Sequence, residues 1–282
     1  MTTIEDIILQ KDGRNISALR PYLPSNYAEE AADLILDHPG KALIVTGFYI
    51  VYAEAPETDG PPGAVAIGEA LARIGYEVAY VTDKYSSDVM KSVAGDSPVI
   101  EFPVADHMES AEAARKILET EKPSLVIAIE RAGLVGDGTF RNMHGTDISE
   151  YNAKIDHLFE QHPYSVGIGD GGNEIGMGNL RDEAAGIDRL PDDPCVTQTT
   201  KLMIASVSNW GGYGLAAALS IKKGANLLPS LETENAWVQA TYEAGAVDGP
   251  TGEHRAYVDG FRLDEYNACL TDLHEHVNVA LS

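Results

Sequence analysis

The stretch Tyr164–Asn179, YSVGIGDGGNEIGMGN, begins as an apolar run and passes into a loop that is rich in glycine. The run Tyr164–Ile168 has the composition of a buried strand. The glycines that follow allow the backbone to turn sharply or to approach a ligand closely. In open α/β sheets, ligands bind outside the carboxyl ends of the strands. This stretch therefore predicts a sheet and also the edge of that sheet where a site lies.

Further apolar runs alternate with helical patterns along the chain. Lys41–Phe48 (KALIVTGF) and Leu125–Glu130 (LVIAIE) are the clearest strands, and Tyr27–His38 (YAEEAADLILDH) is the clearest amphipathic helix. The remaining strands are expected at Glu77–Thr82, Pro98–Val104 and Leu202–Val207, and the remaining helices at Ala64–Ile74, Ser110–Thr120, Asp147–Gln161, Gly211–Ile221, Asn235–Ala244 and Asp264–Val279. This alternation predicts an α/β fold: a mostly parallel central sheet with helices on both faces, in a Rossmann-like three-layer sandwich.

The chain shows no segment with the composition of a linker. Its 282 residues, 44% of them hydrophobic, suffice for a large core. We therefore expect a single domain over 1–282. Its N-terminal helical segment is expected at 1–40, and its C-terminal helical segment, packed on the domain, at 225–282.

Composition excludes several classes of function. The net charge of −24 disfavours nucleic-acid binding and anionic membrane surfaces, because phosphates would be repelled. No apolar run is long enough for a membrane span, and the first residues do not resemble a secretory signal. Two isolated cysteines, Cys195 and Cys269, argue against a disulfide scaffold or a thiolate metal site. We expect a cytoplasmic protein that binds a small molecule, and the oligomeric state stays open.

Acidic, amide and hydroxyl side chains follow several of the expected strands. Thr46-Gly47 ends the first strand, and the loop Glu54–Gly63 follows it; Glu130-Arg131 ends the fourth strand and Asp170 the fifth. Carboxyl ends of parallel strands meet at one edge, so these groups are expected to converge there. Carboxylate oxygens are the ligands that magnesium and manganese prefer. The ligands expected for such a divalent metal, Mn or Mg, are Glu130, Asp170, Asp59 and Asp137.

The same glycine loop permits a second interpretation. Gly167–Gly172 fits the pattern G-x-G-x-x-G, and Asp188 lies at the distance that a dinucleotide fold requires. However, Asp170 and Glu174 fall inside or beside the loop, where their charges would repel a pyrophosphate. Nicotinamide binding is therefore the weaker interpretation.

The chain contains no G-x-S-x-G, H-E-x-x-H or P-loop motif. This absence favours acid–base and metal chemistry over a covalent intermediate.

Four motifs together resemble the D-glutamate cyclase C-terminal domain family, in its stand-alone form. They are Gly167–Gly178, Ser208–Gly212 (SNWGG), Glu57–Gly63 (ETDGPPG), and Ala128–Gly133 (AIERAG) with Asp137-Gly138. The resemblance extends from about Lys41 to about Gly224. It implies a carbon–oxygen lyase that converts D-glutamate to 5-oxo-D-proline and water.

The resemblance and the acidic residues together suggest roles for single residues. Glu130 and Asp170 are expected to act through the metal, and Glu174 is the expected base for the substrate ammonium. Arg131 or Arg141 is expected to bind the α-carboxylate. The other expected substrate contacts are Thr46, Gly47, Asn142, Gly171, Asn173, Ser208 and Asn209. Two alternatives remain open: a metal-dependent phosphatase or other hydrolase using the same pocket, and a non-catalytic small-molecule-binding protein.

Overall fold

Six parallel strands form the central sheet in a computed structural model that describes residues 2–282. In chain order they are β1 (Lys41–Val45), β4 (Glu77–Asp83), β5 (Val99–Phe102), β6 (Leu125–Ile129), β7 (Ser165–Gly169) and β8 (Lys201–Ile204). Their order across the sheet is β5-β4-β1-β6-β7-β8, and each neighbouring pair is parallel. This is the strand order 3-2-1-4-5-6 of doubly wound folds. The predicted fold class is confirmed.

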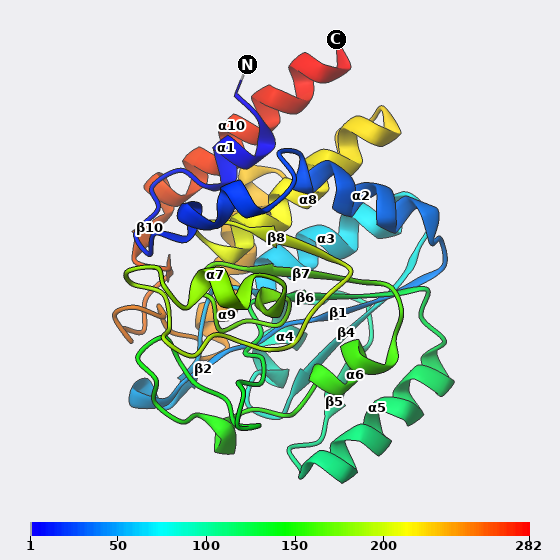
Figure 1. Cartoon of the computed structure of the whole chain (residues 1–282). Helices are drawn as coiled ribbons and strands as arrows, with labels where there is room; N and C mark the ends of the chain where they lie inside the picture. Colours follow the sequence, from blue (N-terminus) through cyan, green and yellow to red (C-terminus); the bar gives the residue numbers. More distant parts are fainter. Residues whose placement is uncertain (1) are drawn as a thin grey trace.

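Helices cover both faces of the sheet (Figure 1). Side chains alternate along each strand, so Ala42 and Ile44 of β1 face one core while Leu43 and Val45 face the other. The first core is completed by α2 (Tyr27–Asp37), α3 (Pro61–Arg73), α4 (Ser87–Val93) and α8 (Ser208–Lys223), and the second by α5 (His107–Glu121) and α6 (Asp156–Gln161). The result is a three-layer sandwich.

The two terminal segments pack outside α8. Helix α10 (Leu263–Leu281) contacts α8 and α1 (Ile4–Ile8), and it is preceded by the hairpin β9 (Tyr257–Val258) and β10 (Phe261–Arg262). A second hairpin joins β2 (Tyr49–Ile50) to β3 (Ala55–Pro56). The remaining elements are η1 (Ile16–Tyr22), η2 (Val51–Ala53), η3 (Ser149–Tyr151), η4 (Met177–Leu180), α7 (Arg181–Ala184) and α9 (Leu231–Glu243).

One expected helix is wrong. Within Asp147–Gln161 only the short turn η3 and the helix α6, which begins at Asp156, are helical. The backbone between them forms hydrogen bonds with side chains from elsewhere in the chain: the N–H of Ala153 donates to Asp83, and its carbonyl accepts from Arg131. These bonds replace the helical ones that the pattern predicted.

Two boundaries differ from the expected ones in a way that matters for the site. Strand β1 ends at Val45, which leaves Thr46 and Gly47 outside it, and α8 begins at Ser208 rather than Gly211. The free N–H groups at the start of α8 therefore lie three residues earlier than the sequence suggested. Across residues 2–282, no helix combines the length and the apolar character that crossing a membrane requires.

A buried acid joins α8, α9 and α10. Glu234 of α9 accepts a hydrogen bond from the hydroxyl of Tyr213 in α8 at 3.3 Å, and Tyr213 contacts the hydroxyl of Tyr266 in α10 at 3.0 Å. Glu234 is fully buried, and burial raises its pKa to about 8. Burial therefore favours the protonated form of Glu234 in the folded protein.

Glu234→Gln is expected to remove a pH dependence of stability. Because the folded pKa lies above the usual 4.5, folding favours the protonated acid, so wild-type stability falls as pH rises from about 4.5 to about 8. The slope in this window approaches ~1.4 kcal/mol per pH unit from this group alone. Urea unfolding at several pH values measures it. Relative to wild type, the variant should gain stability as pH rises, whereas Glu232→Gln, on the exposed side of the same helix, should not.

Candidate metal and substrate site

The centre of the sheet is the topological switch point of the fold. From β1 the chain continues to β4 on one side, whereas from β6 it continues to β7 on the other. The connections that follow β1 and β6 therefore diverge, and such a divergence leaves a crevice at the carboxyl ends of the two strands. Glu130 directly follows β6, and Asp59 lies in the connection that leads from β1 to α3.

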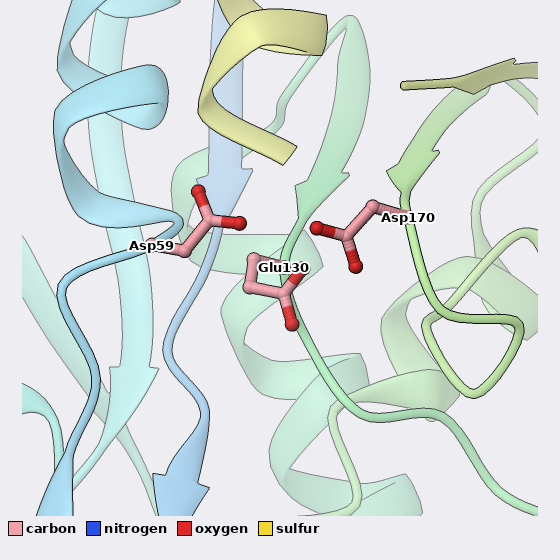
Figure 2. A group of neighbouring side chains, drawn as sticks. All are labelled: Asp59, Glu130 and Asp170. Atoms are coloured by element: carbon pink, nitrogen blue, oxygen red, sulfur yellow. The ribbon is translucent and has the colours of Figure 1, made fainter. Parts of the chain in front are cut away.

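Three buried carboxylates meet at this crevice. One oxygen from each of Asp59, Glu130 and Asp170 lies within 4.8 Å of the others. Figure 2 shows the three side chains pointing toward one another from the start of α3, the end of β6 and the end of β7. The sequence predicted that these three residues would come together, and the structure brings them together.

The amino end of α8 holds two of the three acids. The N–H of Ser208 donates to Asp59 at 3.0 Å and to Asp170 at 3.1 Å, and the N–H of Asn209 donates to Asp59 at 2.8 Å. The first N–H groups of a helix lack partners within the helix and carry partial positive charge. The side chain of Asn209 also accepts from the N–H groups of Gly60 and Gly63, which fixes the loop that carries Asp59.

Glu130 is the least satisfied of the three. Its Oε2 atom is buried and has no hydrogen-bond partner among the described residues. Its backbone adopts a φ of 43°, in the left-handed region that residues other than glycine rarely occupy. Such strain, of about 1–3 kcal/mol, is concentrated at functional sites.

Burial and mutual repulsion disfavour the charged forms of these acids. Burial, followed by the charge of Asp259, raises the pKa of Asp59 to about 7. Burial, with the charge of Asp170 next in importance, raises the pKa of Glu130 well above its usual range. Burial likewise raises the pKa of Asp170, while Arg14 opposes that change. With all three acids ionised, the cluster would therefore contain more negative charge than its protein surroundings neutralise.

These observations fit a divalent cation. Converging carboxylate oxygens suit magnesium or manganese, and the unpartnered Oε2 atom of Glu130 is a free ligand atom. A cation at this position would also offset the repulsion among the acids. Asp59, Glu130 and Asp170 are therefore the residues that could hold a metal.

Three further residues lie at the site, and the sequence assigned a role to none of them. Arg14, between α1 and η1, forms an ion pair with Asp170 at 3.0 Å and a two-pronged pair with Asp259, between β9 and β10. Glu57 lies beside the cluster, and burial followed by the charge of Asp59 raises its pKa well above the usual range. Glu57 lies in a motif that carried the family resemblance. No local signal marked Arg14 and Asp259, which are 245 residues apart.

A cavity of about 800 Å³ opens onto the cluster. Its volume is ample for an amino acid. The titratable groups that line it are Arg14, Glu57, Glu130, His144, Asp170, Glu174 and Arg189, and the other lining residues include Phe48, Tyr52, Asn142, Met143, Asn173 and Leu190. Asn142 and Asn173, two of the expected substrate contacts, therefore lie where a ligand would meet them.

The two expected carboxylate-binding arginines are engaged elsewhere. Arg131 is 1% exposed and pairs with Asp83 at 2.6 Å, and it also donates to the carbonyls of Gly47 and Ala153. Arg141 pairs with Asp137 at 2.8 Å outside the cavity lining. Asp137 is half exposed through its side chain and is not one of the converging acids.

Glu174 supports the glycine loop. Its Oε1 accepts from the N–H groups of Asp170 and Gly171, and its Oε2 accepts from that of Gly172. Both oxygens are thus used in fixing the turn that carries Asp170. The expected contact residues that do not line the cavity are Thr46, Gly47, Gly171, Ser208 and Asn209, which lie behind or beside the acids.

A doubly wound parallel sheet with acids at its switch point defines an α/β protein of the kind that binds small ligands at the carboxyl ends of its strands. Residues 4–274 match the model of the family described as D-glutamate cyclase-like, C-terminal. The chain belongs to this family.

The proteins that the chain resembles include the following two. Human mitochondrial D-glutamate cyclase is 36% identical over 210 residues, which cover 67% of this chain and 34% of the human protein. The chain thus spans about a third of the length of that curated relative. The crystal structure of an exopolyphosphatase-related protein from Bacteroides fragilis superposes with a TM-score of 0.44 at 10% identity, over 92% of this chain and 61% of that one. So low a score bears on neither fold nor activity.

Proposed function

We propose that the protein is a lyase that converts D-glutamate to 5-oxo-D-proline and water with the help of a divalent metal. The observation that carries the proposal is the convergence of Asp59, Glu130 and Asp170 beside a cavity of amino-acid size, in a chain of the D-glutamate cyclase-like family. The named activity of the human relative supports the choice of substrate.

Ring closure forms a bond between the amino nitrogen and the γ-carboxyl carbon and breaks a carbon–oxygen bond, so that one oxygen leaves as water. A bound divalent metal would supply Lewis acidity, which makes a carboxylate a better electrophile. Asp59, Glu130 and Asp170 would hold that metal. The walls of the cavity would hold the substrate bent, with its amino nitrogen close to the γ-carboxyl carbon. Binding energy would then offset much of the entropic part of the barrier.

The ammonium must lose a proton before it can attack. Glu57 lines the cavity beside the acidic cluster, and burial raises the pKa of its carboxyl group. A raised pKa lies closer to that of an ammonium group, which favours proton transfer between them. We therefore propose Glu57 as the base in preference to Glu174, whose two oxygens already accept backbone hydrogen bonds.

The proposal predicts a stereospecific reaction. Purified protein incubated with Mn²⁺ or Mg²⁺ should form 5-oxoproline from D-glutamate and not from L-glutamate, and a chelator should stop the reaction. Chromatography on a chiral phase measures the product. The amino group and the carboxyl group that react belong to the same substrate molecule. Product should therefore appear without any second substrate.

Other outcomes would contradict this assignment. Release of phosphate from phosphomonoesters, without 5-oxoproline, would favour a hydrolase at the same acids. Stabilisation of the protein by D-glutamate without turnover would favour a binding protein.

A further inference from the structure

Arg14 is presented to the cavity by a reinforced turn. The carboxylate of Asp12 accepts from the N–H groups of Arg14, Ile16 and Ser17, at 3.1, 3.2 and 2.8 Å. Arg189 fixes the preceding residue from the other side by donating to the carbonyl of Gly13 at 2.9 Å. The turn that carries Arg14 is therefore held by side chains from two parts of the chain.

Asp170 and Asp259 use only part of the guanidinium group. Asp259 accepts hydrogen bonds from Nη1 and Nη2, and Asp170 forms an ion pair with Nη1. Arginine has five N–H hydrogens, so the Nε–H and one Nη2–H remain without a protein partner among residues 2–282. These two hydrogens lie on one edge of the planar group, and such an edge matches the two oxygens of a carboxylate.

Charge in the cavity points to the same ligand chemistry. The acids Glu57, Glu130, Asp170 and Glu174 line it and would repel an anionic group that met no cation. Two arginines, Arg14 and Arg189, also line it. Of these, Arg14 forms an ion pair with the metal candidate Asp170, and its side chain keeps 22% exposure. A substrate with two carboxylates therefore finds one position at the three-acid cluster and a second at Arg14.

We infer that Arg14 receives the α-carboxylate of an amino-dicarboxylate substrate and selects it over amino acids that lack this group. The inference rests on the proposed function for the identity of the two carboxylates, since the γ-carboxyl carbon must react beside the metal ligands. Asp259 is a positioning residue that holds the guanidinium plane. The N-terminal and C-terminal segments thereby contribute to substrate selection as well as to the core.

The test compares two substrates that differ by one group. 4-Aminobutyrate has the ammonium and the γ-carboxylate of D-glutamate but no α-carboxylate, and its cyclisation gives 2-pyrrolidinone. Arg14→Lys keeps the charge and removes the flat edge. We expect kcat/KM for D-glutamate to fall by about 100-fold in this variant, mainly through KM, because the α-carboxylate is bound before and during the reaction alike.

For 4-aminobutyrate the change in kcat/KM should stay below about threefold, because this compound has no α-carboxylate for Arg14 to bind. Arg20→Lys is the matched control: Arg20 also lies in the N-terminal segment and pairs with Asp6 at 2.5 Å, outside the cavity lining. This variant should leave kcat/KM unchanged for both substrates. An equal loss on both substrates in Arg14→Lys would overturn the inference, because it would show a general effect on the site.

Calorimetry separates this inference from the proposed function. If no variant turns over either compound, the binding of each to Mn²⁺-loaded wild type and Arg14→Lys still decides. Tighter binding of D-glutamate than of 4-aminobutyrate by wild type, with the difference lost in the variant, supports Arg14 even when cyclisation fails. Equal affinities in wild type would overturn it. Asp259→Asn keeps one oxygen that can accept from Arg14, so it should reduce the difference in affinity between the two compounds by a smaller factor than Arg14→Lys does. This second variant replaces Arg14→Lys in the test if that protein does not fold.

Discussion

Asp170→Asn is expected to abolish turnover of D-glutamate and to weaken Mn²⁺ binding by at least about 100-fold. The amide keeps the shape of the side chain, and its oxygen can still accept from the N–H of Ser208. It removes one of the three negative charges that converge at the switch point. The fold should persist, because loss of a buried charge among like charges relieves repulsion.

Calorimetric titration with Mn²⁺, circular dichroism and the 5-oxoproline assay measure the three parts of this prediction. Asp88→Asn is the matched control, since Asp88 lies on α4 with a side chain that is 94% exposed. It should match wild type in every measurement. Retained turnover in Asp170→Asn would remove the metal from the mechanism.

Gly178→Ala is expected to cause the largest loss of stability, on the order of 3 kcal/mol in the free energy of unfolding. A Cβ atom at this position would lie 2.4 Å from the carbonyl oxygen of Val196. The clash is with backbone, which cannot rotate away as a side chain can. Relief would require the segment of residues 195–199 to move away from the glycine loop.

Urea unfolding measures this effect, and Gly186→Ala is its control. A Cβ atom at Gly186 would meet nothing within 4 Å, so that change should stay within about 0.5 kcal/mol of wild type. If Gly178→Ala were as stable as wild type, the close packing of the glycine loop against residues 195–199 would be wrong.

The sequence was sufficient to predict the sheet and to group three of the four expected metal ligands; the fourth, Asp137, lies apart from them. Buried parallel strands are continuous apolar runs, so β1 and β6 were recognisable without their neighbours. Asp59, Glu130 and Asp170 could be grouped because parallel strands bring their carboxyl ends to one edge. The family resemblance narrowed the expected substrate, and the family itself is confirmed over residues 4–274.

Ion pairs between residues far apart in the sequence could not be predicted from local patterns. Arg131 follows β6, as a ligand-binding residue would, but its charge is paired with that of Asp83, the last residue of β4. The same bonds keep Ala153 out of the helix that its surroundings predicted. Arg14 appeared only as part of a helical segment, because nothing near it in the sequence indicates the contact with Asp259.

The pairing of Arg14 with Asp259 has a consequence for the synthesis of the protein. These residues are 245 positions apart, and the three-acid cluster lies between them in the chain. A chain that emerges from the ribosome can form the sheet and gather its acids long before residue 259 is available. The arginine then lacks the partner that orients it, so a nascent or truncated chain would possess the acids without the means to select a substrate. If Arg14 selects the substrate as inferred, activity would be delayed until nearly the whole sequence has folded.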